Sequence, residues 1–84
     1  ASVIKVLFFG QLKEQLGVTG IEVLVDVDIN VSQLIDNIIK THPKWAQDIN
    51  HETVLVAVDQ IMAKAGTLVP VSCEVAFFPP VTGG

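Results

Sequence analysis

One segment of this sequence carries a clear helical period, and a helix with a single apolar face must pack against something. Its apolar residues recur at the spacing of one helical face: Val31, Leu34, Ile35, Ile38 and Ile39. Asn30 suits the N-cap, Gln33 lies at the third helical position as in a capping box, and Ile29 precedes the cap as in a hydrophobic staple. Pro43 stops the helix, because the residue before a proline is displaced from the helical region.

The remaining apolar residues gather in runs that are typical of strands. β-branched and aromatic residues are frequent in four of these runs: residues 3–9, 21–27, 54–58 and 73–78. A fifth run, residues 61–65, is expected to form a short strand. A two-residue turn at Asp59 and Gln60 would fold the run that follows it back onto the one before it. Between the first two runs, Leu12 and Leu16 lie four residues apart, which is typical of a short helix or turn.

The order strand, strand, helix, strand, short strand, strand predicts an α+β roll, in which a mixed sheet packs on one main helix. We expect the first two strands to pair antiparallel. A right-handed crossover through the helix is expected to place the strand at 54–58 alongside the strand at 3–9. The length of 84 residues fits a single domain.

Composition limits the possible partners. No apolar run approaches the roughly 18 residues that span a bilayer. The first apolar run has no basic region before it and no small-residue cleavage site after it, so we expect no secretion peptide and a cytoplasmic protein. Five Lys and Arg residues against nine Asp and Glu give a net charge of −4. That charge disfavours nucleic acid and anionic membranes as partners.

The body of the sequence offers little chemistry of its own. His42 and His51 have no cysteine or paired acid at ligand spacing, so we expect no metal site. The single cysteine, Cys73, is interpreted as a small structural apolar residue. The sequence contains no glycine-rich phosphate loop and no recognisable pairing of a nucleophile with a base. We therefore expect a domain that binds no cofactor and is not catalytic alone.

Alternation along the strands places large apolar side chains on both faces of the expected sheet. One set is uniformly apolar and should face the core: Ile4, Val6, Phe8, Val75 and Phe77. Lys5 and Glu74 mark the opposite face as the wetter one, yet Phe9 and Phe78 also belong to it. Met62, on the short strand, extends this pair. A contiguous apolar patch on a solvent-facing sheet predicts a surface for a partner.

The sequence ends in a short arm: Val81, Thr82, Gly83 and Gly84. Pro79 and Pro80 stiffen the exit from the last strand, and four residues reach at most about 14 Å beyond them. Because glycine has no Cβ, the terminal carboxylate would fit a narrow channel in another protein. We expect a folded domain at residues 1–80 and a flexible Gly-Gly tail at 81–84.

Three segments together resemble the small, sulfur-carrying subunit of molybdopterin synthase, which is a ubiquitin-like β-grasp protein. They are the opening IKVLFFGQLKEQLG, the helix from Asn30 to Ile39 and the ending VAFFPPVTGG. The resemblance covers nearly the whole chain. The ending is closer to this subunit than to thiazole-forming sulfur carriers or to ubiquitin. The resemblance implies a ubiquitin-like β-grasp fold.

The resemblance also implies a mechanism centred on Gly84. An adenylyltransferase resembling ubiquitin-activating enzymes would use ATP to adenylate the Gly84 carboxylate, because a carboxylate is a poor acyl electrophile. Delivery of sulfide would then leave a thiocarboxylate. The large synthase subunit would receive Gly83 and Gly84 in its active site, where the sulfur builds the dithiolene of the molybdenum cofactor. The residues expected to bind partners are Phe9, Met62, Phe78, Pro79, Pro80, Val81 and Thr82.

This sequence departs from the family pattern in two turns. Val71, Ser72 and Cys73 stand where an acidic residue, glycine and aspartate are usual, so we expect the geometry of that turn to change. Asp59 stands where asparagine is common. Three alternative functions stay open: a sulfur carrier for thiamine thiazole synthesis, a protein modifier conjugated to lysine through Gly84, and an interaction domain with an inert tail.

Overall fold

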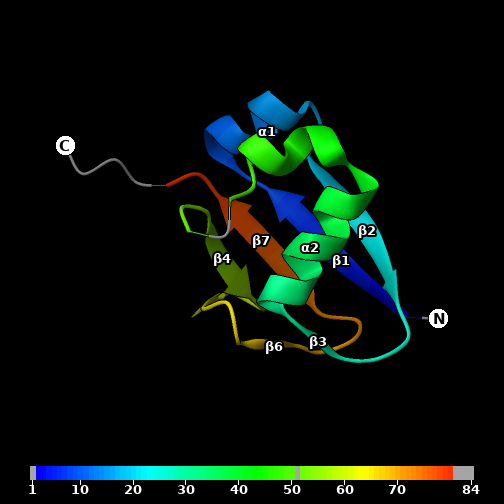
Figure 1. The fold of residues 1–84 in the computed structure, drawn as a ribbon. Helices are drawn as coiled ribbons and strands as arrows, with labels where there is room; N and C mark the ends of the chain where they lie inside the picture. The colour runs from blue at the N-terminus through cyan, green and yellow to red at the C-terminus, as the bar shows by residue number, and fades with distance from the viewer. Residues whose placement is uncertain (1, 51, 81–84) are drawn as a thin grey trace.

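The computed structural model describes residues 2–50 and 52–80, in which helix α2 lies across one face of a mixed sheet and α1 lies at one end of it (Figure 1). The elements are β1 (Ser2–Phe8), α1 (Gly10–Leu16), β2 (Gly20–Val25), β3 (Ile29–Asn30), α2 (Val31–Thr41), the 3₁₀-helix η1 (Pro43–Gln47), β4 (Leu55–Val58), β5 (Ile61–Ala63), β6 (Leu68–Val69) and β7 (Glu74–Phe78). The predicted α+β roll is confirmed.

Helix α2 begins with the predicted capping box. The Gln33 backbone N–H donates to the Asn30 side chain at 2.8 Å, and the Asn30 backbone N–H donates to the Gln33 side chain at 2.9 Å. Two backbone donors at the start of the helix are thereby satisfied. The helix ends at Thr41, two residues before Pro43. Its buried face is the one the periodicity predicts: Val31, Leu34, Ile35 and Ile38, with Ile39 partly buried.

The five main strands are ordered β2-β1-β7-β4-β5. Strand β1 pairs antiparallel with β2, as expected, and parallel with β7. The expectation that the strand at 54–58 lies alongside β1 is wrong, because β4 pairs with β7 instead. Val75 and Phe77 of β7 are completely buried. A strand with such side chains is best covered in the middle of the sheet, and β7 lies between β1 and β4.

The core lies between the sheet and α2. Every side chain predicted to face it is exposed by 1% or less: Ile4, Val6, Phe8, Val75 and Phe77. Trp45 of η1 packs against this core, with its ring centroid 5.5 Å from that of Phe8 in an edge-to-face arrangement. Neither η1 nor the short pairing of β3 with β6 was predicted from the sequence pattern.

Three turns depart from ordinary backbone geometry or from the predicted strand ends. Asp59 and Gln60 have φ of 47° and 72°, as a two-residue hairpin with positive φ at both positions requires, which confirms the predicted turn. Ser72 has φ of 69°, which is a conformation that favours glycine. The expectation that β2 reaches Val27 is wrong, since β2 ends at Val25. The chain bends there, and the Asp28 carboxylate accepts the Val71 backbone N–H at 2.9 Å.

Gly20 is required by close contact between β2 and β1. A Cβ at Gly20 would lie 2.5 Å from the carbonyl oxygen of Val6 and 3.0 Å from Leu7 Cδ2. We expect Gly20→Ala to lower the free energy of unfolding by about 2 kcal/mol, because a backbone oxygen cannot move aside as a flexible side chain can. Urea denaturation measures the change. Gly66→Ala is the matched control, since nothing lies within 4 Å of its added Cβ. Equal losses for both variants would contradict the steric explanation.

Ser72 holds a strained backbone conformation. We expect Ser72→Gly to raise the free energy of unfolding by about 0.5–1 kcal/mol, because removing the Cβ relieves more strain than the added unfolded-state entropy costs. Ser72→Ala keeps the Cβ and should leave stability nearly unchanged. Thermal unfolding of the unchanged protein and the two variants measures the differences in stability. A gain for the alanine variant as large as that for glycine would show that the serine hydroxyl, and not the backbone, is the source of the cost.

Candidate functional site

The structure brings the three predicted outer-face residues together around one hollow. Phe9, Met62 and Phe78 line a cavity of about 320 Å³, whose other lining residues are Ala57, Gln60, Glu74 and Ala76. Phe9 and Met62 are exposed by 41% and 61%. This surface, which we call the outer hollow, lies on the sheet face opposite the core.

Strand register explains why this face is hollow. Met62 of β5 stands opposite Ala57 of β4, and Ala57 stands opposite Ala76 of β7. Two alanines in neighbouring central strands form a low floor, and the larger side chains of Phe9, Phe78 and Met62 rise around it. Strand alternation puts Ala76 on the same face as Glu74 and Phe78, but it does not show that Ala57 and Ala76 together form a floor. In each strand a small residue at an outward position lies between two apolar core residues. That pattern is the sequence feature that could have indicated the floor.

The rim of the outer hollow carries two polar groups, of which the sequence pattern had placed only Glu74 on this face. Gln60 comes from the β4–β5 turn and Glu74 from the start of β7. The Asp59 carboxylate accepts the Glu74 backbone N–H at 3.0 Å, and the Asp59 backbone N–H donates to the Glu74 carbonyl at 2.8 Å. These two hydrogen bonds fix the turn against β7. The rim therefore has a fixed acidic side next to an apolar floor.

Contacts of Phe9, Phe78 and Pro79 fix the direction of the chain after the last strand. The Phe9 backbone N–H donates to the Phe77 carbonyl at 3.1 Å. The rings of Phe9 and Phe78 stack with centroids 5.1 Å apart and planes inclined by 15°. The Pro79 ring lies close to Gly10, since a Cβ on that glycine would be 3.5 Å from Pro79 Cγ. These contacts orient the chain up to Pro80 before residues 81–84 begin.

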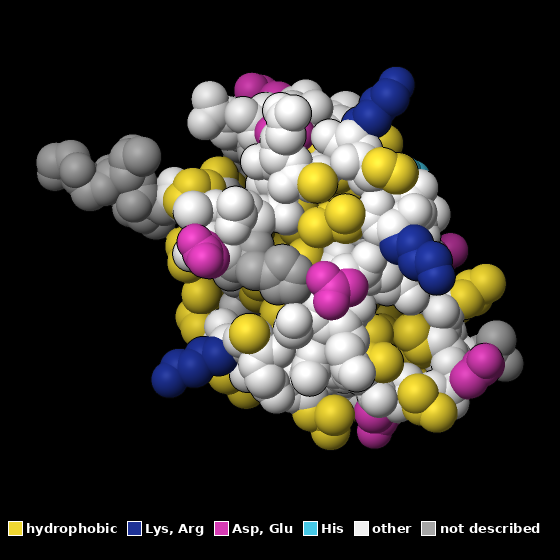
Figure 2. All heavy atoms as spheres, in the orientation of Figure 1, with side chains coloured by type: hydrophobic (Ala, Val, Ile, Leu, Met, Phe, Trp, Pro, Cys, Tyr) yellow, Lys and Arg dark blue, Asp and Glu magenta, His cyan; other side chains and the backbone are white. Residues whose placement is uncertain are grey.

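A second, polar hollow adjoins the same exit. It has a volume of about 280 Å³ and is lined by Pro79 and Pro80 together with side chains from α1, η1 and the following loop: Gln11, Gln15, Gln47, Asp48 and Thr53. Figure 2 views the molecule from the helix side, and hydrophobic side chains reach the surface at the margin where the chain leaves the domain. The two prolines thus have hydrogen-bonding side chains of α1, η1 and the following loop beside them.

Cys73 is a structural residue, as predicted. Its side chain is 7% exposed and belongs to the core. Burial, and then the negative charge of Asp59, raise the pKa of the Cys73 thiol. A raised pKa keeps the sulfur protonated at neutral pH, and only the thiolate is a nucleophile. Cys73 also precedes β7, whereas the tail follows it, so the thiol and the tail lie at opposite ends of this strand.

The structure pairs His42 with Trp45. Their rings stack with centroids 3.9 Å apart and planes inclined by 8°. His51 lies outside the described residues. Over residues 2–50 and 52–80, no three His, Cys, Asp or Glu side chains are grouped as metal ligands would be. Over the same ranges, none of the helices has the length and apolar character needed to cross a membrane.

The predicted tail residues Val81, Thr82, Gly83 and Gly84 lie outside the described residues. The boundary between a domain at 1–80 and a tail at 81–84 therefore stays a prediction. Of the predicted site residues, the structure places Phe9, Met62 and Phe78 around the outer hollow and Pro79 and Pro80 at the chain's exit from it.

Comparison with known proteins identifies the family. The model of the ThiS family matches residues 6–84, which is nearly the whole chain. The chain belongs to the ThiS family. Two curated proteins are similar to this ThiS-family chain over 96% of its length and 99% of theirs. The molybdopterin synthase sulfur carrier subunit of Haemophilus influenzae is 36% identical, and that of Escherichia coli is 38% identical.

Solved structures agree on the fold of this ThiS-family chain. The crystal structure of SAMP1, the small archaeal modifier protein 1 of Haloferax volcanii, superposes with a TM-score of 0.79 at 26% identity. The superposition covers 98% of this chain and 99% of that one. The predicted ubiquitin-like β-grasp fold is confirmed.

Proposed function

We propose that this ThiS-family chain is the sulfur carrier subunit of a molybdopterin synthase. The observation that carries the proposal is its similarity to two proteins of that name at 36% and 38% identity over nearly their whole lengths. Within this proposal the protein works in the cytoplasm, as a heteromer with a large subunit.

The reacting atom in this proposal is the carboxyl carbon of Gly84. An adenylyltransferase transfers AMP from ATP to the carboxylate and releases pyrophosphate, which turns a poor acyl electrophile into an acyl phosphate with a good leaving group. A sulfur donor then attacks that carbon and AMP departs. The product is a thiocarboxylate, with sulfur in the place of one oxygen. ATP belongs to the activating enzyme, and the chain itself holds no cofactor.

The domain's part is to present this group. The outer hollow gives the large subunit an apolar surface beside the exit of the tail. The Phe9–Phe78 stack and the Pro79–Gly10 contact set the direction in which the chain leaves. A partner that covers the outer hollow therefore receives the tail at a defined place. Orientation of this kind removes much of the entropic cost of bringing two reacting groups together.

A protein modifier is the second candidate, since the fold is shared with a small archaeal modifier protein. A carrier and a modifier begin with the same activation of a glycine carboxylate and differ in what attacks it: sulfur in one case, a lysine amine in the other. A carrier for thiazole synthesis shares the thiocarboxylate and differs only in the partner that accepts the sulfur.

Removal of Gly84 tests the reacting atom. We expect the full chain, incubated with an activating enzyme, ATP and a sulfur donor, to gain the mass that replaces one oxygen by one sulfur, localised to Gly84 by fragmentation. The variant lacking Gly84 should gain nothing and keep its urea unfolding midpoint, because residues 81–84 lie beyond β7. Conjugates to lysine without any thiocarboxylate would favour the modifier. No gain, with the enzyme active on another carrier, would contradict both.

The outer hollow is tested separately by a pair of substitutions on one strand. We expect Met62→Glu to weaken binding of the large subunit at least about tenfold, because a buried unpaired carboxylate costs more than 1.4 kcal/mol. Ile61→Glu is the matched control: Ile61 is the adjacent residue of β5, is exposed by 73% and faces the opposite side of the strand. Calorimetry measures both. Equal weakening by the two variants would rule out the outer hollow as the contact surface.

A further inference from the structure

The edge of the sheet formed by β2, at the far side from β5, carries backbone N–H and C=O groups that pair with no other strand of the sheet over the described residues. Strand β2 is at the end of the five-stranded order, with β1 on its inner side. The Phe8 backbone N–H donates to the Thr19 carbonyl, and the register continues as Val6 opposite Ile21 and Ile4 opposite Val23. In an antiparallel pair, bonded residues alternate with residues whose N–H and C=O point away from the partner strand. Glu22 and Leu24 therefore turn these groups to the open edge.

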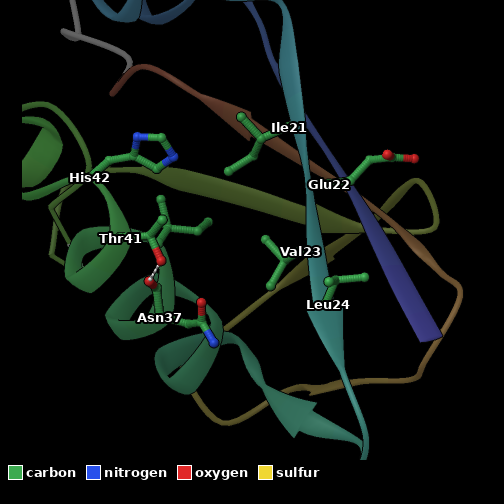
Figure 3. Close-up of a pocket in the computed structure, with 8 residues that line it drawn as sticks. Ile21, Glu22, Val23, Leu24, Asn37, Thr41 and His42 are labelled. Atoms are coloured by element: carbon green, nitrogen blue, oxygen red, sulfur yellow. Dashed lines mark hydrogen bonds between the residues drawn. The ribbon is translucent and has the colours of Figure 1, made fainter. Parts of the chain in front are cut away.

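A hollow lies beside this edge. It has a volume of about 280 Å³ and separates β2 from the C-terminal half of α2 (Figure 3). Ile21 and Val23 point toward the helix, whereas Glu22 and Leu24 point to the other side of the strand. Ile38 adds to the apolar floor, and the helix with the residue that follows it contributes a polar rim: Asn37, Thr41 and His42. In Figure 2, hydrophobic side chains reach the surface over the region where α2 faces β2.

Length and charge at this edge define what fits it. Strand β2 has six residues, compared with three in β5 at the other edge of the sheet. Leu24 is 69% exposed. Long open edges are usually blunted by lysine, proline or a covering loop, and β2 contains no lysine or proline. The charges here are acidic, Glu22 on the strand and Asp26 just after it. Lys5 neighbours Glu22 only from the β1 side.

A second copy of this chain is a poor match for the edge. Pairing β2 with β2 would set Glu22 and Asp26 of both copies along one seam, and each chain already has a net charge of −4. Like charges on directly paired strands are destabilising. The complementary occupant is a segment with positive charge at the position facing Glu22.

We propose that the β2 edge and the adjoining hollow bind an extended segment of a partner protein by antiparallel strand addition. The segment carries a lysine or arginine opposite Glu22 and an apolar residue on each side of it. Strand alternation directs those two apolar side chains over Ile21, Val23 and Ile38, while the basic side chain lies on the outer face beside Glu22. Its backbone pairs with the N–H and C=O groups of Glu22 and Leu24.

This site lies on the other side of the fold from the C-terminal end of β7 (Figure 1). The outer hollow and the β2 edge share no lining residue. A segment bound along β2 therefore leaves the outer hollow and the tail accessible. The carrier can be held by one partner at β2 while its tail reacts with another.

A defined peptide tests the proposal on the full chain. The probe is a capped seven-residue peptide in which valine occupies alternate positions, lysine the centre and threonine the two remaining positions. Its titration into isotope-labelled protein, followed by amide chemical shifts, should move Glu22 and Leu24 together with Asn37 and Thr41. A methyl group on the backbone nitrogen of the central lysine removes the donor that faces β2, and should weaken binding about tenfold or more. Methylation of the adjacent valine nitrogen, which points away, should leave binding unchanged.

Two protein variants complete the test. Glu22→Pro removes the outward N–H without removing a bond to β1, and should abolish the shifts; its folding is checked by urea unfolding. Glu22→Gln keeps the backbone donor and should retain binding with a weaker dependence on salt. The comparison of the two methylated peptides uses the unchanged protein, so it remains a valid test even if the proline variant is unstable. Equal affinity of the two methylated peptides, shifts confined to the outer hollow, or no shifts at millimolar peptide would each overturn the proposal.

Discussion

The fold depends on the parallel pairing of β1 with β7, which joins the two ends of the chain at the centre of the sheet. Parallel strands require a long connection, and here everything from α1 to β6 lies between the two. The pairing is favourable because both strands place completely buried side chains on the same face, including Val6 and Val75, which stand opposite one another. Helix α2 then covers that face.

The same pairing positions the candidate site. Because β1 and β7 run side by side in one direction, their last residues meet, and the rings of Phe9 and Phe78 stack at the point where the chain leaves the sheet. The core face of these strands stabilises the domain, while the outer face has small residues at Ala57 and Ala76 and remains open. The completely buried side chains of these strands and the candidate site thus lie on opposite faces of one sheet.

Much of the candidate site could be predicted from the sequence because strand alternation is a local property. It separated Phe9 and Phe78 from the buried Phe8 and Phe77, and the structure agrees. Gln60 could not be predicted as part of the rim, since it joins Glu74 only after the β4–β5 hairpin pairs with β7. The hollow beside β2 was also beyond prediction, because it depends on how far α2 stands from the sheet edge.

The sequence by itself determined the elements whose causes lie within a few residues: the capping box at Asn30 and Gln33, the apolar face of α2, and the turn at Asp59 and Gln60. Only the tertiary structure decided the strand order, in which β7 and not β4 is the neighbour of β1. The same holds for the end of β2, where Asp28 binds the backbone of a residue 43 positions away. Local propensities act along the chain, whereas strand neighbours and loop contacts are chosen by the burial of side chains that are distant in sequence.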